Sequence, residues 1–85
     1  MKVTINSISG LSGKPASVFA REAKRFSSRI TVLFDGRGAN GKSLSSLSSL
    51  GAGNGDEVEI TAEGEDAEEA LLLLSKLAED GLEDR

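Results

Sequence analysis

Ser12 lies within residues 9–16, where a strand-like segment is followed by a helix-like segment. Ser12 suits the N-cap of that helix, because a serine oxygen can accept a hydrogen bond from a free amide of the first turn. Pro15 fits the same turn, since its missing N–H would have no helical partner there. The first amides of a helix are unpaired and its dipole is positive at that end, which favours anions. The segment therefore has the form of a functional site.

A second candidate lies in residues 36–43, GRGANGKS, which match the full pattern of a phosphate-binding P-loop. In that interpretation loop amides hold nucleotide phosphates, Lys42 contacts the terminal phosphates and Ser43 binds magnesium. The short chain and the lack of a parallel βαβ unit in its first half oppose this interpretation. The dipeptide Asp35-Gly36 opposes it too, because it is a strong hairpin signal and places the first glycine of the pattern in a turn. A nucleotide binder therefore ranks last among the functions that these residues allow.

The stretch after Lys42 alternates serines with leucines at every third position, namely Leu44, Leu47 and Leu50. This spacing predicts a short helix with a narrow apolar ridge against a sheet. Ser43 is the expected N-cap of that helix, which explains this serine without any further role.

The composition excludes several classes of site. The sequence contains no cysteine and no histidine, so it has no disulfide, no thiolate metal site and no imidazole base. We therefore expect no metal, no cofactor and no enzymatic activity. There is no run of about 18 apolar residues and no leader pattern, so we expect a cytoplasmic protein without a membrane span or a signal peptide.

Charge is divided along the chain. Residues 1–42 contain eight Lys and Arg against two Asp and Glu, whereas residues 43–85 contain two against twelve. The basic residues could form a face for an acidic partner, or the two halves could neutralise each other in the folded chain. The members of that candidate face are Lys14, Arg21, Lys24, Arg25 and Lys42. We expect no binding to nucleic acid, because the balance is acidic and the sequence has neither Tyr nor Trp.

The elements that must position these residues follow from hydrophobic periodicity. Alternation predicts strands over residues 2–6, 30–34 and 58–62, with a short strand near 37–40. Helical spacing predicts a first helix over 13–27, a short helix after Ser43, and a final helix from Ala67 that ends at Gly81. This order and polarity predict an α+β fold in one domain over residues 1–85, with helices on one face of an antiparallel sheet.

Two leucines do not belong to the buried stripe of the final helix. Leu72 points away from that stripe and Leu73 flanks it. Single exposed leucines are common in soluble proteins, and a weak self-association patch is the alternative interpretation. We expect a monomer.

The first segment resembles the phosphorylation-site loop of HPr, the histidine phosphocarrier of the bacterial sugar phosphotransferase system. Gly10, Leu11, Pro15 and Ala16 match that loop, Lys14 replaces its arginine, and Ser12 stands where the phosphorylated histidine would be. The resemblance extends over roughly residues 2 to 80. The further matching segments are Glu22-Ala23-Lys24 with Phe26, Ile30-Thr31-Val32, Lys42-Ser43-Leu44, Leu47, Leu50-Gly51 and residues 62–66.

The resemblance implies an open-faced β-sandwich of four antiparallel strands with three helices on one side. It also implies a phosphoryl relay among phosphotransferase-system proteins, for which a serine is poorly suited, because a hydroxyl needs an adjacent base. Ser43 matches the family's regulatory serine, which an HPr kinase modifies and a catabolite-control regulator reads. The residues expected to contact such partners are Lys14, Arg21, Lys24, Lys42, Leu44 and Leu47.

Two functions fit these implications about equally. The first is a regulatory HPr-like protein that acts through Ser43. The second is an engineered or vestigial HPr scaffold without activity.

Overall fold

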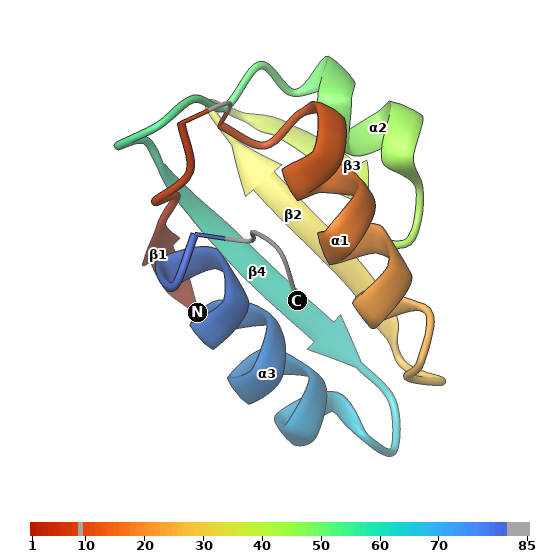
Figure 1. Ribbon diagram of the computed structural model, residues 1–85. Helices are drawn as coiled ribbons and strands as arrows, with labels where there is room; N and C mark the ends of the chain where they lie inside the picture. The colour runs from red at the N-terminus through yellow and green to blue at the C-terminus, as the bar shows by residue number, and fades with distance from the viewer. Residues whose placement is uncertain (9, 82–85) are drawn as a thin grey trace.

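The structure, a computed structural model, describes residues 1–8 and 10–81. The chain forms four strands and three helices (Figure 1). They are β1 (Lys2–Thr4), α1 (Gly13–Ala23), β2 (Arg29–Phe34), β3 (Arg37–Asn40), α2 (Leu44–Ser49), β4 (Glu57–Glu63) and α3 (Ala67–Glu79). The predicted order of elements is confirmed.

The four strands form one antiparallel sheet in the order β1-β4-β2-β3. β2 and β3 are joined by the predicted hairpin turn, in which Asp35 and Gly36 have φ values of 52° and 79°. Positive φ at both central residues gives a turn whose twist matches that of the flanking strands. The hairpin places β3 at one edge of the sheet and β1 lies at the other.

All three helices lie on one face of the sheet, as Figure 1 shows. The alternating apolar residues of the strands face these helices, so that Val3, Val32, Val58 and Ile60 are buried. Phe19 is the largest fully buried side chain. The predicted open-faced α+β sandwich is thus confirmed, because a two-layer arrangement buries one face of the sheet and leaves polar residues on the other.

The first helix is shorter than its sequence pattern predicts. α1 ends at Ala23, with Lys24 as C-cap, whereas the pattern predicts a helix up to Ser27. The backbone N–H groups of Ser27 and Ser28 donate to the carboxylate of Asp66, at 2.9 and 3.0 Å, instead of continuing the helix. A long-range contact therefore ends the helical pattern early.

The final helix follows its prediction closely. Ala70, Leu74 and Ala78 are buried, while Leu72 is 65% exposed and Leu73 is half-buried. The helix ends at Glu79, just before Gly81. Within residues 1–8 and 10–81, no helix has the length and apolar character that a membrane crossing requires.

Candidate functional site

Ser12 occupies the N-cap position of α1, as the sequence predicts, but it does not cap the helix. Its backbone is extended, with φ −147° and ψ 167°, and its side chain makes no capping hydrogen bond. The predicted acceptor role of its oxygen is therefore wrong. Gly13 follows with φ +61° and no neighbouring atom around the site of a Cβ. This left-handed conformation suits glycine and strains any side chain that replaces it.

The loop before Ser12 is fixed by a close approach to residues 52–53. A Cβ on Gly10 would lie 2.5 Å from the carbonyl oxygen of Ala52, so only glycine fits there. The next residue, Leu11, is buried and donates its backbone N–H to the same carbonyl oxygen at 2.9 Å. These contacts hold Ala52 and Gly53 against Gly10 and Leu11 through the backbone.

Ser43 caps α2 as predicted. Its hydroxyl oxygen accepts a hydrogen bond from the backbone N–H of Ser46 at 3.3 Å and lies 3.4 Å from the hydroxyl of Ser45. Ser43 is half-buried, and its neighbour Leu44 is 45% exposed. The serine is therefore reachable from solvent at the start of a short helix.

The ammonium group of Lys42 contacts the segment that follows the first helix. This group donates to the carbonyl oxygen of Phe26 at 2.7 Å, and the Lys42 backbone N–H donates to the Asn40 side chain at 2.9 Å. The P-loop interpretation is wrong, because residues 37–40 of the pattern form β3 in a hairpin rather than a phosphate-binding loop.

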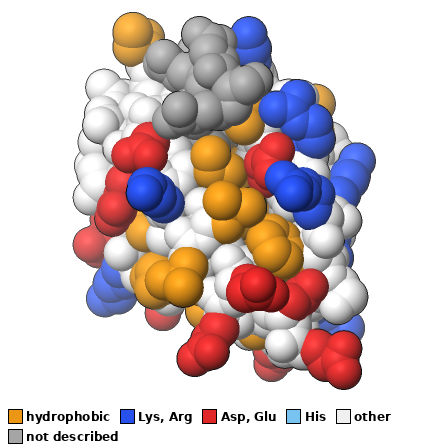
Figure 2. Space-filling view, turned by 60° about the horizontal axis from the view of Figure 1, so that its bottom comes forward, with side chains coloured by type: hydrophobic (Ala, Val, Ile, Leu, Met, Phe, Trp, Pro, Cys, Tyr) orange, Lys and Arg blue, Asp and Glu red, His pale blue; other side chains and the backbone are white. Residues whose placement is uncertain are grey.

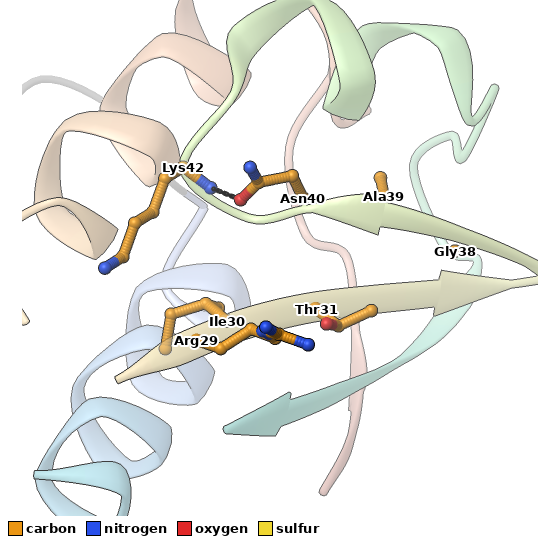
Figure 3. A pocket seen from close by; sticks show the side chains of 7 residues that line it. All are labelled: Arg29, Ile30, Thr31, Gly38, Ala39, Asn40 and Lys42. Carbon is orange, nitrogen blue, oxygen red and sulfur yellow. Dashed lines mark hydrogen bonds between the residues drawn. The ribbon is translucent and has the colours of Figure 1, made fainter. Parts of the chain in front are cut away.

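A pocket of about 430 Å³ lies beside this segment (Figure 3). Its lining residues are Arg29, Ile30, Thr31, Gly38, Ala39, Asn40 and Lys42. Figure 3 shows the ammonium end of Lys42 pointing away from the guanidinium of Arg29. The two cations do not converge on one ligand, so the pocket is not a phosphate cradle. Among the described residues, no cluster of acidic side chains is suited to a metal ion.

Ser12 and Ser43 lie toward opposite ends of α1. Ser12 precedes the helix, whereas Lys42, next to Ser43, bonds to Phe26 just beyond the other end. A helix of 11 residues is about 16 Å long. The structure therefore separates the two candidate serines rather than combining them in one site.

The residues predicted to contact partners divide in the same way. Lys14 is exposed near Ser12, while Arg21 and Lys24 are exposed toward the other end of α1. Leu44 is exposed on α2, which packs beside α1 (Figure 1). Leu47 is fully buried, so its assignment to a partner surface is wrong. Its face of α2 packs into the core.

Sequence analysis missed the role of Asp66. Its carboxylate accepts hydrogen bonds from the Ser28 hydroxyl and from the backbone N–H groups of Ser27 and Ser28. These bonds, the Ser28 hydroxyl first, hold the pKa of Asp66 below its ordinary value. Asp66 shows no side-chain cap of its own helix and instead joins the start of α3 to the end of α1.

Comparisons with known proteins agree with the observed fold. The family model described as PTS HPr component phosphorylation site matches residues 1–80. The phosphocarrier protein HPr of Borreliella burgdorferi is 44% identical over 75 residues, which are 88% of this chain and 87% of that protein. The HPr-like protein Crh of Bacillus subtilis is 42% identical over 74 residues, which are 87% of each chain. The crystal structure of HPr-C-His from Thermoanaerobacter tengcongensis has a TM-score of 0.93 at 36% identity and covers 100% of this chain and 96% of that chain.

Proposed function

The chain belongs to the HPr family of the bacterial sugar phosphotransferase system, and from this premise we propose that it acts as a regulatory member of that family through Ser43. Proteins of this family are phosphocarriers and regulators rather than enzymes, as the HPr and Crh relatives indicate. The function proposed for this chain is to be phosphorylated on a serine and then to bind a protein partner in the cytoplasm.

The first part of the proposal is that the chain does not relay phosphate through histidine. The sequence contains no histidine, and Ser12 stands at the matching position in the resemblance. A serine hydroxyl needs a neighbouring base before it can attack a phosphoryl group, and no imidazole exists in the chain to provide one. A phosphoserine is also a poor phosphoryl donor. Both points favour a family member without carrier activity at Ser12.

The second part is that Ser43 accepts phosphate from an HPr kinase. The observation that carries it is the position of the Ser43 hydroxyl, half-exposed at the start of α2 and bonded to the backbone N–H of Ser46. A phosphate at a helix start meets unpaired amides, so the fold tolerates the modification. The bond from Lys42 to Phe26 holds the segment that presents the serine.

The third part concerns the partner. A phosphate on Ser43 would add a dianion beside the exposed Leu44 and near the end of α1 that carries Arg21 and Lys24. We propose that these residues, with Lys14 at the margin, contact a transcriptional regulator of carbon catabolism. Lys42 supports this surface and Leu47 packs beneath it.

The experiment is a binding titration with such a regulator. Ser43→Asp is expected to bind more tightly than the unmodified chain, because the carboxylate mimics part of the new charge. Ser45→Asp, two residues along the same helix, is the matched control and is expected to leave the affinity unchanged. The regulatory function would be rejected if Ser43→Asp and the phosphorylated protein both bind the regulator with the same affinity as the unmodified chain. That result would favour a scaffold without activity.

A further inference from the structure

The loop before β4 contains a dipeptide that can react without an enzyme. On the face shown in Figure 2, cations and carboxylates are mixed around hydrophobic side chains, so charge alone does not define a ligand there. Residues 53–56 lie at the other end of the sheet, where β4 begins (Figure 1). They include Asn54-Gly55, which is one of two Asn-Gly pairs in the chain; the other is Asn40-Gly41.

An Asn-Gly pair loses ammonia by an intramolecular reaction. The backbone nitrogen of the glycine gives its proton to solvent and attacks Cγ of the asparagine, and the carboxamide nitrogen takes up a proton and leaves as ammonia. Water then opens the succinimide ring at either carbonyl, which gives aspartate or isoaspartate. Glycine favours the attack, because it has no Cβ to crowd the nitrogen. The reaction therefore needs a glycine N–H without a bound acceptor and a carboxamide that is free to rotate.

The fold opposes both requirements at Asn40-Gly41. The Gly41 N–H donates to the carbonyl oxygen of Ile30 at 2.8 Å. Gly41 is also buried, so closely that a Cβ on it would lie 2.5 Å from a methyl carbon of Ile30. The carboxamide oxygen of Asn40 accepts the Lys42 N–H at 2.9 Å. This pair is therefore released only when β3 separates from β2 and Gly41 leaves the core, which requires extensive unfolding.

The turn at Asn54-Gly55 is held by a few hydrogen bonds at the surface. Asp56 donates its backbone N–H to the carbonyl oxygen of Gly53 at 3.0 Å and accepts the Gly53 N–H on its carboxylate at 2.7 Å. The Gly55 N–H donates to the carbonyl oxygen of Ile5 at 2.8 Å. Asn54 and Gly55 are exposed, and nothing in the part of the chain that the structure describes bonds to the Asn54 carboxamide. Breaking the one bond to Ile5 thus frees the Gly55 nitrogen beside an unrestrained carboxamide.

We propose that Asn54 is a site of spontaneous deamidation in the folded chain and that Asn40 is protected from it. The reaction at Asn54 proceeds through local opening of residues 53–56. Its rate is the rate in the unfolded chain multiplied by the fraction of time for which the bond from Gly55 to Ile5 is open. Two identical dipeptides in one chain therefore react at different rates because of their hydrogen bonds and burial.

The modification acts on the loop before α1. Either product adds a carboxylate close to that of Asp56, and isoaspartate also routes the backbone of the turn through the side-chain carbon of residue 54. Ala52, in the same loop, accepts the Leu11 N–H at 2.9 Å, and the carbonyl oxygen of Asp56 accepts the Ile5 N–H at 2.8 Å. A distorted turn therefore loosens both the end of β1 and the loop before α1.

Peptide mapping after incubation at mildly alkaline pH tests the proposal. Trypsin separates the two sites, since residues 38–42 and 43–76 form different peptides. In the folded chain, the mass gain of an amide-to-acid conversion is expected at Asn54 at least about tenfold faster than at Asn40, because local opening is more frequent than global opening. In urea that unfolds the chain, both sites are expected to react at similar rates. Equal rates in the folded chain, or a faster reaction at Asn40, would overturn the proposal.

A variant of the turn tests the route through local opening. Asp56→Ala releases the Gly53 N–H and is expected to speed the reaction at Asn54 in the folded chain about tenfold, as loss of a hydrogen bond to a charged group does. Glu57→Ala, at the exposed next position, is the matched control and is expected to leave the rate unchanged. Each rate is divided by that of the same variant in urea. An Asp56→Ala chain that reacts no faster than Glu57→Ala would overturn the local route.

Hydrogen exchange of the separated product measures the effect on the loop before α1. Exchange at the Leu11 and Ile5 N–H groups is expected to be faster than in the unmodified chain. The Ser46 N–H, which bonds to the Ser43 hydroxyl in α2, is the internal control and is expected to keep its rate. Unchanged exchange at Leu11 and Ile5, or an equal increase at Ser46, would contradict a modification that acts through residues 52–56.

Discussion

The ammonium group of Lys42 lies 2.7 Å from the carbonyl oxygen of Phe26 and donates a hydrogen bond to it. This contact joins the segment before α2 to the segment after α1, which are 16 residues apart in the chain. Lys42 matches a nucleotide-binding pattern in the sequence, but in the structure it anchors the segments beside two helices to each other. The position of Ser43, the next residue, depends on that anchor.

Replacing Lys42 tests the anchor. Lys42→Met keeps most of the aliphatic stem but leaves the Phe26 carbonyl without its donor, which costs about 1 kcal/mol of unfolding free energy. A loss of that size lowers the melting temperature of a domain this small by about 4–8 °C. Thermal unfolding measures the change. Lys24→Met, at an exposed position, is the control and is expected to shift the melting temperature far less; equal shifts would contradict the anchoring role.

The lowered pKa of Asp66 predicts that the free energy of unfolding decreases in acid. Its pKa is lower in the folded chain, so its stabilising effect is complete above the unfolded-state value of about 3.9 and is lost as pH falls through the folded value. Asp66→Asn is expected to be less stable at neutral pH and to lose less stability on acidification. Denaturant unfolding at several pH values measures both.

Glu63→Gln is the control for that series, because the Glu63 side chain is exposed at the end of β4 and its carboxylate accepts no hydrogen bond from the described residues. Its acid-induced loss of stability is expected to remain close to that of the unmodified chain. If Asp66→Asn and the unmodified chain lose stability in parallel, the three donors to Asp66 have no energetic effect on folding.

Introducing a histidine at position 12 tests whether the loop before α1 can accept a phosphoryl group. Ser12→His is expected to accept phosphate from enzyme I and phosphoenolpyruvate, because Ser12 keeps an extended backbone at the start of α1 and Pro15 and Ala16 are buried in place. Gly13 must remain, since a side chain at its φ of +61° costs about 1–3 kcal/mol. Acid-labile labelling measures acceptance, with Ser12→Ala as the control. A folded Ser12→His that takes up no phosphate would show that the surface for enzyme I is gone too.

The fold was predictable from the sequence because most of its signals are local. Alternation in residues 58–62, the turn at Asp35-Gly36 and the apolar stripe of the final helix each depend on a few neighbouring residues. The end of α1 was not predictable in this way, because Asp66 reaches Ser28 across 38 residues of chain. Tertiary contacts of that kind leave no periodic pattern in the sequence.

The candidate site was predictable only in part. The capping role of Ser43 follows from its position before a helix, and the structure confirms it. The P-loop pattern that ends at Lys42 and Ser43 was misleading. The same sequence fits a phosphate-binding loop or a β-hairpin, and only the pairing of β2 with β3 distinguishes the two. Spacing put Leu44 and Leu47 on one ridge, yet a six-residue helix packed on one side buries Leu47 and exposes Leu44.

Intact-mass measurement after incubation with each phosphate donor tests the central claim most directly. With HPr kinase and ATP, the chain is expected to gain one phosphate, which Ser43→Ala abolishes and Ser45→Ala does not. With enzyme I and phosphoenolpyruvate, the mass of the unmodified chain is expected to stay the same, because no histidine is present to accept the group. A phosphate on Ser12 from enzyme I, or no phosphate on Ser43 from the kinase, would contradict the account.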